Sequence, residues 1–352
     1  ASHNPYYDNG IKFFSSEGFK LSDEWEIEME ALIETQSFGG SLPADWDIGK
    51  NTKIDDAAGR YIEFVKATFR RPLSLKNMKI SLDCANGAAY RVAPLVFKEL
   101  DATVFVSGIS PNGLNINDNC GSLHPENVQK SVIDHHADVG IALDGDGDRV
   151  IMIDEKAQIV DGDSILAICA ENMKKNGTLR NSKVVATVMS NLGIIKALES
   201  LDIEVICSKV GDRYVIKDML DNEANLGGEQ SGHLIFLDHT PTGDGLISAL
   251  QVLQIMIDTD SKLSDLVSRY PRFPQASVNV PVSSKPPLDE LSQVKKIILK
   301  FEENLRDSGR VLVRYSGTED LCRVMVEGPN LKQVTQMANA IAETVKETIG
   351  KV

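Results

Sequence analysis

Three aspartates alternate with glycines in the segment LDGDGDR, at Asp144, Asp146 and Asp148. The preceding residues, VGIAL (139–143), have the pattern of a buried strand. Three carboxylates spaced in this way repel one another unless a cation neutralises them, and the glycines allow a tight turn that would point the oxygens inward. Hard oxygen ligands favour Mg²⁺ or Ca²⁺ over soft metals. The segment therefore predicts a divalent metal site.

An EF-hand calcium loop is excluded for this segment, although Glu155 stands at the twelfth position counted from Asp144. The sixth position of such a loop is a glycine, whereas this chain has Arg149 there. The flanking residues also have the pattern of strands rather than helices. The remaining alternative to a metal site is a solvated acidic turn.

A possible phosphate site lies in RVLVRYSGTEDLCR (310–323). A predicted strand ends near Arg314 and leads into a loop that contains Ser316, Gly317 and Thr318. Hydroxyls and backbone N–H groups can bind phosphate oxygens, and an arginine can add a bidentate contact. Arg323, on the next predicted strand, could converge on the same anion. The composition also suits an ordinary turn, so this segment alone leaves both interpretations open.

The glycine-rich segment LGGEQSGH (226–233) carries the polar side chains of Glu229, Gln230, Ser231 and His233. Such a loop suits the recognition of sugar hydroxyls, and a polar hairpin is an equally good interpretation.

The segment ASHNPYYDNGIK (1–12) contains Ser2, His3 and Lys12. Adjacent Ser and His side chains do not make a catalytic triad, and the chain has no GxSxG motif. Asn-Pro and Asn-Gly pairs indicate turns. By itself this segment predicts an exposed polar loop.

The elements that would position these residues alternate between strands and helices, which predicts α/β layers with a largely parallel sheet. Strands are predicted at 79–84, 102–108, 139–143, 149–154, 183–188 and 203–208, and helices up to Leu100, at 125–136, at 163–174 and from about 212. Two helices precede them, one after Ser22 and one that ends near Arg71-Pro72. After Pro271 and Pro274, a strand, a helix (287–305), two strands (310–314, 322–326) and a helix (331–348) predict a small α+β domain.

The composition sets broader limits. A length of 352 residues predicts two to four domains, and a net charge of −14 argues against nucleic acid or an anionic membrane as a partner. We see no signal peptide and no apolar run long enough to span a membrane. The five cysteines form no CxxC pair, which is typical of reduced thiols in the cytoplasm.

Taken together and in this order, the four motifs resemble those of the α-D-phosphohexomutase superfamily. ASHNP resembles its phosphoserine loop, DGDGDR its metal loop, GGEQSGH its sugar-specificity loop and RYSGTE its phosphate-binding loop. The resemblance spans the whole chain. It implies three α/β domains, the first truncated at its N-terminus, and a smaller C-terminal α+β domain around a central cleft. The implied domains are 1–71, 72–158, 159–270 and 271–352.

Details of the motifs resemble the branch of that superfamily that acts on glucosamine phosphates. They are YYDNGIKFF (6–14), DCANGAAY (83–90), PNGLNINDNCGS (111–122), KVGDRYV (209–215) and Gln230. Asp320 departs from the family, which often has a proline there. The resemblance implies an isomerase that interconverts glucosamine 6-phosphate and glucosamine 1-phosphate, on the pathway to UDP-N-acetylglucosamine. The alternatives are a phosphomannomutase/phosphoglucomutase and a non-catalytic phosphosugar-binding fragment.

The resemblance also implies roles for individual residues. Ser2 would carry a phosphoryl group through a sugar 1,6-bisphosphate intermediate, with one Mg²⁺ per subunit bound by Ser2 and the three aspartates. The other implied catalytic residues are His3, Lys12 and Arg149. The implied substrate-binding residues are Lys209, Arg213, Glu229, Ser231, Arg314, Ser316, Gly317, Thr318 and Arg323. Glucosamine 1,6-bisphosphate or glucose 1,6-bisphosphate would activate the enzyme, and a homodimer is a further expectation.

Overall fold

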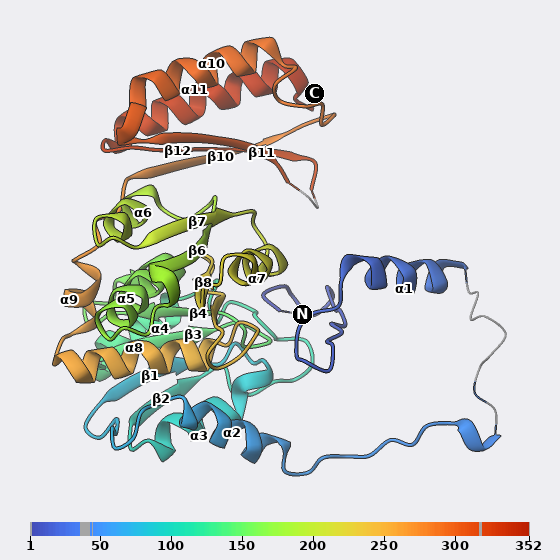
Figure 1. Cartoon of the computed structure of the whole chain (residues 1–352), viewed down its shortest axis with the longest axis vertical. Helices are drawn as coiled ribbons and strands as arrows, with labels where there is room; N and C mark the ends of the chain where they lie inside the picture. The colour runs from blue at the N-terminus through green and yellow to red at the C-terminus, as the bar shows by residue number, and fades with distance from the viewer. Residues whose placement is uncertain (1, 36–42, 44, 317–318, 352) are drawn as a thin grey trace. The chain divides into compact units, whose positions relative to one another are not determined.

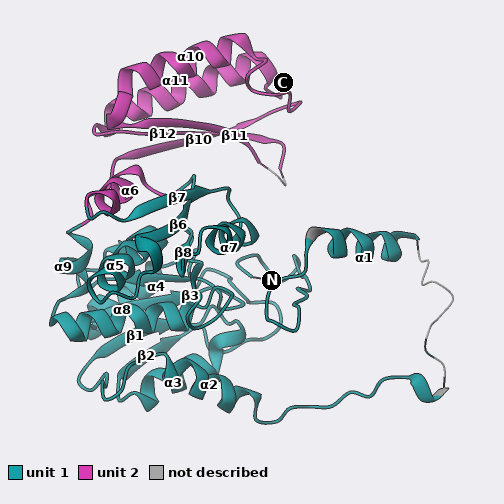
Figure 2. Ribbon diagram, viewed as in Figure 1, with its two compact units in different colours: residues 1–189, 201–269 teal, residues 190–200, 270–352 magenta. Residues whose placement is uncertain are grey.

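The computed structural model describes residues 2–35, 43, 45–316 and 319–351, and the chain forms two compact units. Unit 1 contains residues 1–189 and 201–269, and unit 2 contains residues 190–200 and 270–352 (Figures 1 and 2). The chain therefore enters unit 2 once for the short helix α6 (Leu192–Glu199) and again at Tyr270. No described helix combines the length and the apolar character needed to cross a membrane.

A five-stranded sheet in unit 1 has the order β2-β1-β3-β4-β5. Its strands are β1 (Lys79–Asp83), β2 (Thr103–Ser107), β3 (Val139–Leu143), β4 (Val150–Ile153) and β5 (Ile159–Val160). Strands β2, β1 and β3 are parallel, but β4 and β5 are antiparallel to their neighbours. The sheet is therefore mixed rather than largely parallel, because the short link between β3 and β4 cannot hold a crossover helix.

Helices cover this sheet and bury its central strands. Helix α4 (Glu126–His135) packs against β1 and β3, and α3 (Val92–Glu99) packs against β2. Every residue of β3 and β4 is buried, as expected for strands covered on both faces. The loops that follow β1, β2 and β3 leave from the same edge, since these three strands are parallel.

A four-stranded sheet, also in unit 1, has the order β7-β6-β8-β9. Strands β6 (Lys183–Thr187), β7 (Glu204–Ser208) and β8 (Leu226–Gly228) are parallel, and β9 (Leu234–Phe236) returns antiparallel to β8. The glycine-rich segment therefore forms the predicted hairpin. The helices around this sheet include α5 (Gly162–Lys175), α7 (Asp212–Asp221), α8 (Gly245–Thr259) and α9 (Leu263–Val267).

Helix α8 was not among the predicted elements. Ten of its 15 residues are buried, so apolar side chains occur around most of its circumference and the period of a half-exposed helix is weak. Its N-terminus is capped by Asp244, whose Oδ1 accepts hydrogen bonds from the backbone N–H groups of Leu246 and Ile247.

Most of the described residues before residue 57 are exposed. This part of the chain contains helix α1 (Asp23–Thr35), at the position predicted after Ser22, and the 3-10 helix Asp45–Asp47. Tyr7 is 71% exposed and Ile11 is 83% exposed. Helix α2 (Ala57–Ala67) then packs against α3. Among the residues of this chain, individual hydrogen bonds to Ser2 and its neighbours therefore position this segment.

Unit 2 has the antiparallel sheet β10-β12-β11, with α10 and α11 packed against it. Its elements are β10 (Gln275–Pro281), α10 (Ser292–Leu305), β11 (Arg310–Tyr315), β12 (Leu321–Glu327) and α11 (Leu331–Ile349). Helix α10 begins at Ser292 rather than at residue 287, because the preceding residues form a turn in which the Glu290 N–H donates to the Pro287 carbonyl oxygen at 3.0 Å. The small α+β unit is otherwise as predicted.

A buried carboxylate connects α6 to this sheet within unit 2. The side chain of Glu327 is fully buried and accepts hydrogen bonds from Arg310 Nε (2.6 Å), Asn191 Nδ2 (3.2 Å) and the backbone N–H of Leu192 (3.3 Å). Arg310 also donates to the carbonyl oxygen of Ser190. A buried charge with several partners is costly to lose, since its partners are then left without a counter-charge.

We predict that Glu327→Ala destabilises the protein by about 3–5 kcal/mol, because the charge of Arg310 and the donors at the start of α6 lose their acceptor. Urea unfolding followed by far-UV circular dichroism measures this loss. Glu302→Ala, at an exposed position of α10, should change the stability by less than about 0.5 kcal/mol. Equal effects of the two substitutions would contradict the structural role of Glu327.

Candidate active site

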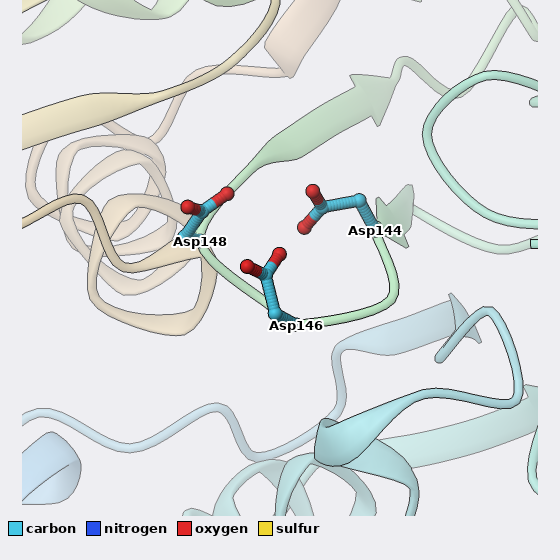
Figure 3. Close-up of side chains that lie close together, drawn as sticks. All are labelled: Asp144, Asp146 and Asp148. Atoms are coloured by element: carbon cyan, nitrogen blue, oxygen red, sulfur yellow. The ribbon is translucent and has the colours of Figure 1, made fainter. Parts of the chain in front are cut away.

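The three predicted metal-binding aspartates lie in the turn between β3 and β4, and their carboxylates point toward a common space (Figure 3). One oxygen of each carboxylate lies within 4.8 Å of the others. Gly147 has a φ of +78°, a backbone conformation that a residue with a side chain rarely adopts. The local sequence and the end of a buried strand therefore suffice to bring the three acids together.

Two oxygens in this cluster are buried without a hydrogen-bond partner among the described residues, namely Oδ1 of Asp146 and Oδ1 of Asp148. Buried polar atoms of this kind call for an explanation such as an ion. The Nζ atom of Lys12 lies 2.6 Å from Asp146 Oδ2 and 3.3 Å from Asp148 Oδ2. An ammonium group therefore already neutralises part of the cluster, as a divalent cation would.

The surroundings shift the pKa values of Asp144 and Asp148 in opposite directions. Burial, together with the charges of Asp148 and Asp146, raises the pKa of Asp144 to about 7. Burial would raise the pKa of Asp148 as well, but the neighbouring His233 and the charges of Lys12 and Arg149 hold it far below its usual range. Below neutral pH, Asp144 is therefore the member of the cluster that holds a proton.

Ser2 lies at the rim of this cluster. Its Oγ is 3.5 Å from Asp144 Oδ2 and 3.3 Å from His3 Nδ1. The side chains of Ser2 and His3 thus meet despite being adjacent in sequence. Burial and the neighbouring Arg149 lower the pKa of His3, which favours its neutral form at physiological pH. A Cβ atom on Gly145 would lie 2.5 Å from the Ser2 carbonyl oxygen, so only a glycine allows this approach.

The glycine-rich hairpin touches the metal loop. The backbone N–H of Val150 donates to the carbonyl oxygen of Gly232, and Arg149 forms a β-bridge with His233. The ring of His233 is almost fully buried, and its Nδ1 lies 3.6 Å from Asp148 Oδ2. His233 was noted within its motif but assigned no role, because sequence spacing gave no sign that it would meet an acid so far away in the chain.

The predicted sugar-binding residues fall into two groups. Glu229 accepts a hydrogen bond from the Gly211 N–H at 2.8 Å, and Ser231 Oγ lies 3.5 Å from Glu229 Oε2. Arg213 instead forms an ion pair with Glu26 of α1 at 2.6 Å. The ammonium group of Lys209 lies 5.7 Å from the centre of the Tyr214 ring. The hairpin therefore presents Glu229 and Ser231 together, whereas Lys209 and Arg213 have other partners.

The predicted phosphate-binding residues belong to unit 2. Arg314 on β11 is directly opposite Arg323 on β12, and burial together with the charge of Arg323 lowers the pKa of Arg314. Arg323 also forms an ion pair with Glu319 at 2.8 Å and lies 3.5 Å from Ser316 Oγ. Two adjacent guanidinium groups repel each other and favour a bound anion. Gly317 and Thr318 lie outside the described residues.

Comparison with known proteins identifies the family. Residues 1–40, 59–158 and 161–273 match the phosphoglucomutase/phosphomannomutase alpha/beta/alpha domains I, II and III, and residues 278–344 match the C-terminal domain of the same proteins. A phosphoglucosamine mutase from Protochlamydia amoebophila is 70% identical over 350 residues, which are 99% of this chain and 77% of that protein. The chain belongs to the phosphoglucomutase/phosphomannomutase family.

A second relative supports the same family, and a solved structure supports the fold. A phosphoglucosamine mutase from Chlamydia caviae is 59% identical over 99% of this chain and 76% of its own length. Among solved structures, the N-acetylphosphoglucosamine mutase of Aspergillus fumigatus, in complex with GlcNAc-6P and magnesium, has a TM-score of 0.75 at 19% identity and covers 100% of this chain and 88% of its own. The multidomain α/β fold predicted from the motifs is confirmed.

We predict that the affinity of the aspartate cluster for Mg²⁺ rises with pH up to about 7 and then levels off. Asp144 holds a proton below its pKa of about 7, and the metal has to displace this proton. The dissociation constant should fall by up to about tenfold per pH unit below neutrality. Isothermal titration calorimetry in buffers of different ionisation enthalpy should also detect about one released proton at acidic pH. The same affinity at acidic and alkaline pH would rule out this coupling.

Proposed function

We propose that this protein has phosphoglucosamine mutase activity and interconverts glucosamine 6-phosphate and glucosamine 1-phosphate. The observation that carries the proposal is the position of Ser2 Oγ, 3.5 Å from Asp144 in a cluster of three convergent carboxylates. The 70% identity to a phosphoglucosamine mutase supports the choice of sugar. The alternative sugars, mannose and glucose phosphates, would use the same residues and are separated only by kinetics.

Mg²⁺ is the metal that we propose for the aspartate cluster, bound by Asp144, Asp146, Asp148 and an oxygen of the phosphorylated Ser2. The donor set consists of hard oxygens, and two of those oxygens are buried with no hydrogen-bond partner among the described residues. When bound, the ion would supply positive charge close to the phosphoryl group that is transferred.

In the proposed reaction, phosphorylated Ser2 transfers its phosphoryl group to the free hydroxyl of the glucosamine monophosphate. The P–O bond to Ser2 Oγ breaks while a P–O bond to the sugar forms. The hydroxyl proton passes to a base, for which the neutral ring of His3 is the candidate, and the Ser2 oxygen takes a proton from an acid, for which the ammonium group of Lys12 is the candidate. The resulting 1,6-bisphosphate turns round and returns its other phosphoryl group to Ser2. Arg149 would bind the oxygens that gain charge. Positioning and electrostatics supply most of the catalysis in such transfers.

The remaining residues would bind the parts of the substrate that do not react. We assign the sugar hydroxyls to Glu229 and Ser231, with Lys209 and Arg213 as further contacts, because Glu229 and Ser231 lie together on the hairpin that touches the metal loop. The distal phosphate is assigned to the residues at the ends of β11 and β12. They are Arg314, Ser316, Gly317, Thr318 and Arg323.

Other expectations from the sequence stay proposals. Of the proposed domains 1–71, 72–158, 159–270 and 271–352, the boundaries at 158/159 and 270/271 are supported by family matches that cover 59–158, 161–273 and 278–344, whereas the match to domain II begins before residue 72. A sugar 1,6-bisphosphate as activator is supported by the glucose 1,6-bisphosphate bound to a variant of the Aspergillus fumigatus enzyme. The homodimer and the cytoplasmic location remain predictions.

We predict that Ser2→Ala abolishes sustained mutase activity but leaves sugar-phosphate binding intact, because only the phosphoryl carrier is removed. A coupled assay of the full-length protein with glucosamine, mannose and glucose phosphates measures activity and specificity together. Intact mass should show that a fraction of the parent carries one phosphate and that the variant carries none. Normal turnover by the variant would show that another residue is the carrier, and binding without turnover by the parent would favour a non-catalytic protein.

We also predict that Arg314→Ala lowers kcat/KM for glucosamine 6-phosphate by about one to two powers of ten. A charge-assisted hydrogen bond contributes about 1.5–3 kcal/mol, and the substrate uses this contact in both of its orientations. Arg314→Lys should restore only part of the loss, since an ammonium group cannot make a bidentate contact. Two acids that could have engaged Arg314 instead, Glu319 and Glu327, are paired with Arg323 and Arg310. A folded Arg314→Ala variant within about twofold of the parent would contradict the assignment.

A further inference from the structure

We infer that Asn117 is a positioning residue that holds the Ser2 loop, residues 2–4, against the turn between β3 and β4 that carries the three aspartates. Its side-chain Nδ2 donates hydrogen bonds to the carbonyl oxygens of Ser2 (2.7 Å) and Asn4 (2.8 Å). Neither carbonyl is close to Asn117 in sequence, and the motifs described above assign it no role. The inference rests on the proposed function, in which Ser2 carries the phosphoryl group.

The backbone of Ser2 needs such support. Its φ is +46°, in the left-handed region that residues with a side chain seldom occupy unless the surroundings enforce it. The Ser2 carbonyl accepts two hydrogen bonds, one from Asn117 and one from the Gly145 N–H at 2.9 Å. These donors come from two different loops, after β2 and after β3, so together they orient the Ser2 peptide.

The described residues that follow Ser2 directly supply little alternative support, and the ion pairs of Lys20 and Glu26 with Asp212 and Arg213 lie further along the segment. Tyr7 and Ile11 are largely exposed, and Lys12 is attached to the site through its flexible side chain. The two carbonyls that Asn117 binds lie on either side of His3. Asn117 therefore restrains both Ser2 and the histidine that touches its hydroxyl.

Asn117 can do this because its own loop is anchored to the sheet. The fully buried Asp83, at the end of β1, accepts hydrogen bonds from the backbone N–H groups of Ala85 (2.8 Å) and Gly121 (3.0 Å). The Asn117 N–H in turn donates to the Ala85 carbonyl at 2.9 Å. The loop after β2 is thereby fastened to the loop after β1, both at Asn117 itself and at Gly121. A side chain on an anchored backbone can fix the position of a less constrained segment.

The chain offers a matched control at Asn119. Both asparagines lie in the same loop with left-handed backbones, at φ values of +57° for Asn117 and +50° for Asn119. The Asn119 side chain, however, donates to Asp118 rather than to the Ser2 loop. Glycine adopts these φ values without strain, so Asn117→Gly and Asn119→Gly each remove a side chain without forcing the backbone to change.

The test follows the transfer of phosphate from glucose 1,6-bisphosphate to Ser2 in the dephosphorylated full-length protein, by intact mass over time. Asn117→Gly should slow this transfer by about 10- to 100-fold, because a nucleophile displaced by about 1 Å loses that much rate. The parent and Asn119→Gly should react at the same rate. Asn117→Asp, which keeps the shape but lacks the Nδ2 donor, should be as slow as Asn117→Gly.

Two further measurements separate positioning from a general loss of structure. The affinity for Mg²⁺ and the melting temperature should be unchanged in Asn117→Gly, while kcat falls and KM for glucosamine 6-phosphate stays the same. Parental transfer rates in Asn117→Gly and Asn117→Asp, or equal slowing in Asn119→Gly, would overturn the inference. If the parent itself acquires no phosphate on Ser2, the proposed function fails first and the inference falls with it.

Discussion

Mutual repulsion among three carboxylates is the constraint around which unit 1 is organised. Asp144 is almost fully buried and shares a small volume with Asp146 and Asp148, so the folded chain has to supply positive charge there. Lys12, from the N-terminal segment, supplies it directly. His233, from the glycine-rich hairpin, lies beside Asp148. The N-terminal segment, the metal loop and the glycine-rich hairpin are thereby attracted to one place, which is also where Ser2 lies.

The two units concentrate charge of opposite sign. Unit 1 presents the aspartate cluster, which favours a cation, and unit 2 presents Arg314 beside Arg323, which favours an anion. Each cluster is unfavourable without its ligand, because like charges are held close together by paired or connected strands. Within its own unit, each cluster therefore favours a ligand of the opposite charge.

Local patterns predicted the elements well where the pattern was itself local. The strands β3 and β4, the turn between them and the pair of strands that carries Arg314 and Arg323 are all at the predicted positions. The predictions were poorer where burial on most sides of a helix removes its hydrophobic periodicity, as in α8. They were also poorer where the length of the link between two strands decides whether the strands are parallel, as for β3 and β4. In both cases the neighbouring elements, rather than the residues of the segment, determine the outcome.

The sequence alone predicted a divalent metal site, because the spacing of Asp144, Asp146 and Asp148 in a glycine-rich turn leaves few other uses for three acids. It also indicated the family, through four motifs in a characteristic order. Only the tertiary structure showed that His233 meets Asp148 and that Asn117 holds the Ser2 carbonyl. Contacts between residues so far apart in the chain depend on how parallel strands bring their loops to one edge of a sheet, and no local pattern in the sequence encodes that meeting.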